Sequence, residues 1–77
     1  MQKYAGQTRR GGVVAFEVGP DWIDVQFTSG WVYRFSHQRP GRLRVDHMKS
    51  LAMSGQGLST FISRHVKNRY ESRRLGE

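Results

Sequence analysis

Two alternating segments, residues 22–27 and 31–35, flank a short turn at residues 28–30 and constrain the fold of this chain more than any other feature. Apolar side chains occur at every second position of the first segment, which is typical of an antiparallel strand with one buried face. A two-residue loop would place Arg34 among the core residues, whereas a three-residue loop keeps it on the opposite face. Gly30 takes the left-handed conformation that ends such a loop without steric cost. We therefore predict a hairpin with a three-residue turn.

The register of this hairpin assigns side chains to the two faces of a sheet. On the core face it pairs aromatic with β-branched or aromatic side chains, a combination that stabilises cross-strand contacts by up to about 1 kcal/mol each: Phe27 with Trp31, Val25 with Tyr33, and Ile23 with Phe35. The other face is predicted to be uncovered and to show Trp22, Asp24, Gln26, Val32 and Arg34.

A third strand is expected before the hairpin. Residues 13–18 are rich in β-prone side chains and end at Gly19-Pro20-Asp21, where proline presets one turn torsion. Residues 1–12 contain three glycines and no apolar periodicity, so we predict a flexible N-terminal segment that adds nothing to the core.

After Ser36 the apolar period changes from two residues to that of a helix. Pro40 is well placed to open a first helix and Gly55 or Gly57 to close it. The buried face of this helix is predicted to carry Val45, Met48, Leu51 and Ala52. A second helix is expected to begin near Leu58 or Ser59, with the Ser59 hydroxyl as its cap, and to bury Phe61, Ile62 and Val66. Residues 71–77 are interpreted as a basic tail or frayed helix.

The predicted order is thus β-β-β-α-α. It describes an α+β domain over residues 13–70, in which two C-terminal helices cover one face of a three-stranded antiparallel meander. Residues 1–12 and the basic tail of residues 71–77 flank it.

The net charge of +7 is unevenly placed. Residues 1–33 are neutral overall, and residues 34–77 hold the entire excess of positive charge. A cationic half attracts polyanions, so nucleic acid, an anionic membrane surface or an acidic protein becomes the leading class of partner. A solvated basic face that only keeps a small protein soluble is the alternative.

The chain lacks the residues that several classes of function require. The chain has no cysteine, and His37, His47 and His65 have no metal-ligand spacing, so we expect neither metal nor cofactor. The acidic residues form no evident catalytic pair, and we expect no enzymatic activity. No apolar run approaches the roughly 20 residues of a membrane helix, and the N-terminus lacks a signal peptide, which predicts a cytoplasmic protein with no membrane partner.

The chain resembles the KTSC domain, a small bacterial domain found at the C-terminal end of some lysyl-tRNA synthetases and as stand-alone proteins. The matching stretches are residues 25–35 (VQFTSGWVYRF), Arg39-Pro40, and residues 61–70 (FISRHVKNRY), and the resemblance covers about residues 13–70. Phe35 stands where the family has the second Tyr of its Tyr-x-Tyr motif. Because the family is associated with a tRNA-handling enzyme, the resemblance implies RNA binding.

The basic residues that lie along and just past the second predicted helix suit contacts to successive phosphates. On the uncovered sheet face, Trp22 beside Arg34 is a candidate for stacking on a base. The predicted function is a non-enzymatic nucleic-acid-binding module, RNA more than DNA, with the site residues Trp22, Arg34, Arg64, Lys67, Arg69, Arg73 and Arg74. The alternative is a protein-interaction or inhibitor module that docks its arginine-rich face on an acidic protein.

Overall fold

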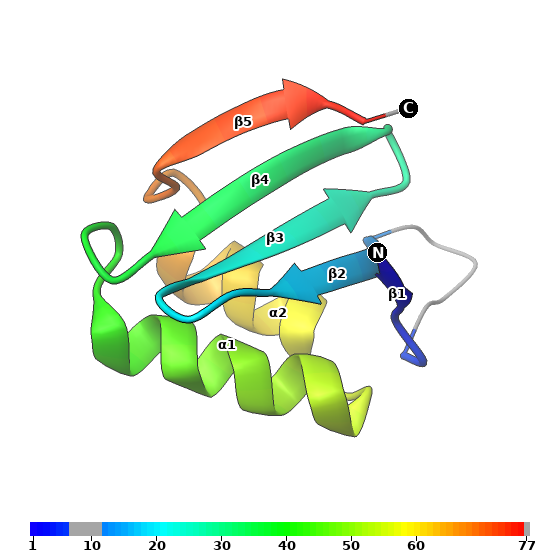
Figure 1. Cartoon of the computed structure of the whole chain (residues 1–77). Helices are drawn as coiled ribbons and strands as arrows, with labels where there is room; N and C mark the ends of the chain where they lie inside the picture. The colour runs from blue at the N-terminus through cyan, green and yellow to red at the C-terminus, as the bar shows by residue number, and fades with distance from the viewer. Residues whose placement is uncertain (7–11, 77) are drawn as a thin grey trace.

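The structure is a computed structural model that describes residues 1–6 and 12–76, and it contains a five-stranded antiparallel sheet with helices over one face (Figure 1). The strands follow one another across the sheet in sequence order, β1-β2-β3-β4-β5. The α+β class and the two-helix cover are confirmed. The predicted three-stranded meander is wrong, because a short strand is added at each edge.

Four strands come first in the chain, the helices follow, and the chain then returns to the sheet as a fifth strand. Their bounds are β1 (Gln2–Lys3), β2 (Val13–Val18), β3 (Trp22–Phe27), β4 (Trp31–Ser36), α1 (Arg42–Ser54), α2 (Leu58–Phe61), the π-helical segment η1 (Ile62–Val66) and β5 (Ser72–Leu75). Part of the predicted flexible N-terminal segment, residues 7–11, lies outside the described residues.

The β3–β4 hairpin has the predicted register. Val25 lies opposite Tyr33 and Ile23 opposite Phe35. Gly30 has a φ of 93° and its N–H donates to the carbonyl of Phe27 at 2.9 Å, which closes the three-residue turn. This register therefore fixes which side chains of β3 and β4 face the helices and which face away.

Strand β5 forms where the sequence suggested a tail or frayed helix. It pairs with β4, with Leu75 opposite Trp31 and Ser72 opposite Arg34. The two arginines of this short polar strand lie on opposite faces of the sheet, and each hydrogen-bonds to a side chain of a neighbouring strand: Arg73 to Tyr33 and Arg74 to Asp24. Arg74 reaches the open face and Arg73 the helix-covered face, so both predicted site residues are held by the sheet.

The N-terminal residues also contribute to the core, contrary to the expectation for residues 1–12. Strand β1 pairs with β2, and Tyr4 is 2% exposed. Its ring meets Phe16 edge to face at 6.5 Å, and its hydroxyl accepts a hydrogen bond from the N–H of Leu58 at 3.1 Å. This contact ties the N-terminus to the start of α2.

The helices close the core against the sheet. Gly55 ends α1 in a left-handed conformation, as predicted, and the buried positions Val45, Met48 and Ala52 face the sheet. The expected cap by Ser59 is wrong: Gly57 holds the cap position, and the Ser59 hydroxyl instead accepts a hydrogen bond from the N–H of Val13 at 3.0 Å. In the described part of the chain, no helix is long and apolar enough to cross a membrane.

Candidate nucleic-acid interface

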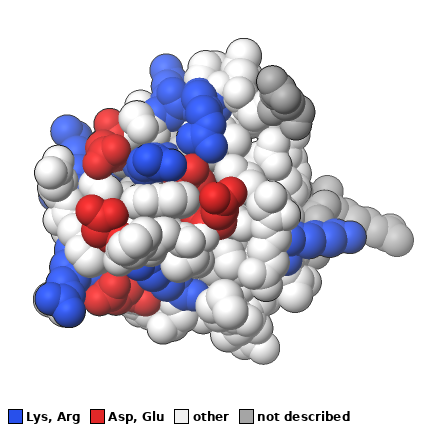
Figure 2. All heavy atoms as spheres, in the orientation of Figure 1, with Lys and Arg blue, Asp and Glu red and all other residues white. Residues whose placement is uncertain are grey.

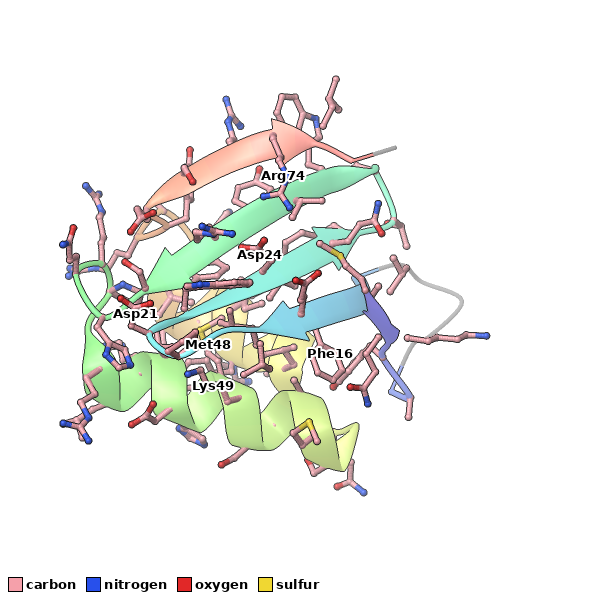
Figure 3. The ribbon with its side chains drawn as sticks, viewed as in Figure 1. Phe16, Asp21, Asp24, Met48, Lys49 and Arg74 are labelled. Carbon is pink, nitrogen blue, oxygen red and sulfur yellow. The ribbon has the colours of Figure 1, made fainter. Side chains whose placement is uncertain are left out.

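Asp24 occupies the centre of the open sheet face and is almost fully buried. It accepts hydrogen bonds from Arg34 through both carboxylate oxygens, at 2.8 and 3.1 Å, and a third from Arg74 at 3.1 Å. Figure 3 shows Arg74 on β5 and Asp24 on β3 reaching toward each other across the sheet. A buried carboxylate requires such partners, since an unpaired buried charge is costly.

Arg34 is held on a second side by Trp22, as the sequence suggested. Its guanidinium carbon lies 4.1 Å from the centre of the Trp22 ring, in a cation–π contact. The hydrogen bond to Asp24 is the main cause that raises the pKa of Arg34 above its ordinary value. Arg34 is therefore a fixed cation, with its Nε and Nη2 donors engaged by Asp24.

The charges of the open face are balanced. Glu17 on β2 lies opposite Asp24, so two carboxylates accompany Arg34 and Arg74 on this part of the sheet. Figure 2, which has the same orientation as Figure 1, shows acidic and basic side chains interspersed over this face. The open face therefore offers little free positive charge to a polyanion.

A cleft with aromatic walls lies on the other side of the sheet, between β4, η1 and the start of β5. It has a volume of about 360 Å³, and Phe27, Tyr33 and Tyr70 contribute rings to it. Tyr33 meets Phe27 at 5.3 Å and Tyr70 at 4.8 Å between ring centres, both nearly perpendicular. Such edge-to-face contacts hold the three rings in place. All three are only half-buried, whereas the neighbouring Phe35 is fully buried.

Two cationic side chains line the same cleft. Arg73 donates a hydrogen bond to the Tyr33 hydroxyl at 3.4 Å, and its guanidinium lies 4.9 Å from the centre of the Trp31 ring. The hydrogen bond with Tyr33 is the main cause that raises the pKa of Arg73. Lys67, exposed just past η1, lines the cleft with the neighbouring Asn68. The cleft thus combines aromatic rings with positive charge.

A polar groove adjoins this cleft at the end of η1. Arg39 and Arg69 line it, and Asn68 lines both the groove and the cleft. Arg39 donates to the Asn68 carbonyl and Arg44 to the His65 carbonyl, each at 3.3 Å. These bonds satisfy carbonyl groups that the end of a helical segment leaves without partners, and they hold Arg39 in position beside the groove.

Five exposed cations around this end of the domain form what we call the basic surface: Arg39, Arg64, Lys67, Arg69 and Arg73. Within residues 1–6 and 12–76, every ion pair involves Asp24 or Asp46, and none involves a member of this set. Exposed cations without carboxylate partners retain their attraction for an external anion.

The seven residues predicted for the site therefore do not form one surface. Arg64, Lys67, Arg69 and Arg73 belong to the basic surface, whereas Trp22, Arg34 and Arg74 lie on the open face around Asp24. Sequence reasoning missed Arg39, which lies in the loop between β4 and α1. Only the folded chain brings this loop next to Asn68 and Arg69 at the end of η1. Sequence reasoning also missed the cleft, since strand alternation assigned Tyr33 to the core face without giving its depth.

A metal site finds no support in the arrangement of the histidines. His37 lies 3.6 Å from Asp46, and no group of three or more His, Asp or Glu side chains converges among the residues described here. Comparison of the chain with protein-family models, curated proteins and solved structures finds no match. The resemblance to the KTSC domain thus stays a prediction from the quoted motifs.

Proposed function

We propose that this domain binds nucleic acid without catalysing a reaction, through phosphate contacts made by the basic surface. The observation that carries the proposal is the difference in carboxylate partners between two groups of cations. Arg34 and Arg74 are engaged by a buried carboxylate, whereas the five cations of the basic surface have none within ion-pair distance in the described chain. Cations free to replace condensed counterions supply most of the affinity of a non-specific nucleic-acid contact.

The preference for RNA over DNA rests on the KTSC resemblance. That resemblance includes residues 61–70, which hold three of the five cations of the basic surface, so it and the charge distribution favour the same part of the chain. Phosphate contacts position a ligand without reading its sequence, so we expect binding with little sequence preference from this surface alone.

The test is fluorescence anisotropy of the purified chain with labelled single-stranded RNA, tRNA and duplex DNA. Lys67→Ala and Lys3→Ala form a matched pair, because each removes one exposed lysine, the first from the basic surface and the second from β1 at the far edge of the sheet. We expect Lys67→Ala to weaken binding and Lys3→Ala to leave it unchanged. Equal effects of the two variants would show that total charge, and not this surface, determines binding.

Competition separates nucleic-acid binding from docking on an acidic protein. An RNA ligand bound by phosphate contacts is displaced by an excess of unrelated RNA, since every RNA carries the same backbone charge. Absence of binding to all three nucleic acids at low salt would contradict the proposal and favour an acidic protein partner instead.

A further inference from the structure

The aromatic cleft next to the basic surface has the dimensions of a pocket for one small ring system. Its volume of about 360 Å³ falls at the lower end of the range of roughly 300–1,000 Å³ for small-ligand sites. Four aromatic side chains and Ile62 form its apolar walls, and Ser29, Ser63 and Asn68 add neutral polar groups. A flat, apolar body with polar edges matches this lining.

The exposure of the rings needs an explanation beyond core packing. Phe27, Tyr33 and Tyr70 pack on one another, yet each keeps part of its surface accessible. Half-exposed aromatic rings gathered beside cations are typical of surfaces that bind single-stranded nucleic acids, where bases stack on rings and the backbone follows the positive charge.

We propose that this cleft holds one unstacked nucleobase, so that the domain selects single-stranded over fully paired nucleic acid. The inference rests on the proposed nucleic-acid function and adds the ligand class of the cleft to it. Lys67 and Arg73 line the cleft and are placed to contact the phosphates that flank the bound base. A paired base offers no free face, so a perfect duplex reaches only the cations.

Charge complementarity selects this ligand over an uncharged aromatic compound. Lys67 lies on the cleft and Arg69 on the groove, and Asn68 between them lines both. A strand with one base in the cleft thus continues along the groove toward Arg39. The cleft supplies the selection for unpaired bases, and the groove supplies affinity for the backbone.

The experiment compares three labelled probes on the full chain: a short uridine oligoribonucleotide, an abasic chain of the same length, and a perfectly paired RNA duplex. We expect the uridine strand to bind about 5- to 150-fold more tightly than the abasic chain, which is the range for stacking of a base on an aromatic side chain. The uridine strand and the abasic chain should show the same salt dependence, because both contact the same cations.

Variants then locate the effect in the cleft. Tyr70→Leu removes a ring of the cleft and should abolish the preference for the uridine strand over the abasic chain without changing the salt dependence. Phe61→Leu is the control, because Phe61 is half-buried but packs between His47 and His65, outside the cleft. Circular dichroism checks that both variants fold, and Phe27→Leu replaces Tyr70→Leu if the latter does not.

The outcomes distinguish this inference from the function on which it rests. Equal affinity for the uridine strand, the abasic chain and the duplex would overturn the base site and leave phosphate binding standing. A Phe61→Leu variant that loses the preference as fully as Tyr70→Leu would also overturn the base site. Failure of all three probes to bind at low salt would overturn both proposals.

Discussion

Asp24 is the most informative residue to change in the sheet, because a single buried carboxylate joins β3, β4 and β5. Asp24→Asn keeps the volume of the side chain but removes its charge and one of its two acceptor oxygens. The hydrogen bonds at stake are the two from Arg34 and the one from Arg74, with donor–acceptor distances of 2.8 to 3.1 Å. We expect the variant to be less stable than the wild type.

The size of the loss follows from how exposed the partners are. Breaking a buried ion pair costs about 3–5 kcal/mol when the remaining charge cannot reach water. Here the side chains of Arg34 and Arg74 are 32% and 53% exposed and can be hydrated after the change. The expected loss is therefore that of charge-assisted hydrogen bonds, about 2–3 kcal/mol. For a domain of this size it lowers Tm by about 10–20 °C.

Urea and thermal unfolding followed by circular dichroism measure this loss. Glu17→Gln is the control, because Glu17 lies opposite Asp24 on β2 but makes no ion pair within the described chain. We expect it to change the free energy of unfolding by less than about 0.5 kcal/mol. An Asp24→Asn variant as stable as the Glu17→Gln variant would refute the assignment of Asp24 as the residue that fastens β5 to the sheet.

Three further changes test the fold. Removing residues 72–77 exposes Val32 and leaves Asp24 with one arginine, so we expect a loss of about 3 kcal/mol or more in urea unfolding; unchanged stability would mean that β5 does not pair. Gly30 and Gly55 both have positive φ, so replacing Gly30 with Ala should cost about 1–2 kcal/mol of backbone strain. A Cβ at Gly55 would also lie 2.9 Å from the Cβ of Ala5, whereas no atom lies within 4 Å of a Cβ at Gly30. We therefore expect Gly55→Ala to lower Tm more than Gly30→Ala. Tyr33→Ala removes a half-buried ring between two others and should cost about 3 kcal/mol, the low end for aromatic truncation; a loss under about 1 kcal/mol would contradict that packing.

The sequence predicted those parts of the fold that depend on local pattern. The alternation before and after residues 28–30, together with Gly30, determined the hairpin register, and the helical spacing up to Gly55 determined α1 and its end. The hairpin signal is strong because the alternative two-residue loop would place the Arg34 guanidinium in the core. The helix signal is strong because the apolar spacing and a closing glycine agree.

The two edge strands could not be predicted, since both are short and polar. Gln2–Lys3 and Ser72–Leu75 lack apolar alternation, and their strand conformation follows from pairing with β2 and β4 after the sheet has formed. The candidate site could not be predicted for the same reason, because it depends on contacts that form only in the folded chain. Charge in residues 34–77 was visible in the sequence, but only the fold shows that Asp24, from the neutral half, engages Arg34 and Arg74, whereas the cations of the basic surface have no carboxylate partner in the described chain.

The salt dependence of single-stranded RNA binding tests the central proposal most directly. If the five cations of the basic surface each contact a phosphate, the logarithm of the association constant should fall with the logarithm of salt concentration with a slope of about -3.5. Replacing Arg64, Lys67 and Arg69 together with Ala should reduce the slope to about -1.4, with the thermal unfolding curve unchanged. A slope that stays near the wild-type value in the folded triple variant would contradict the assignment of nucleic-acid binding to this surface.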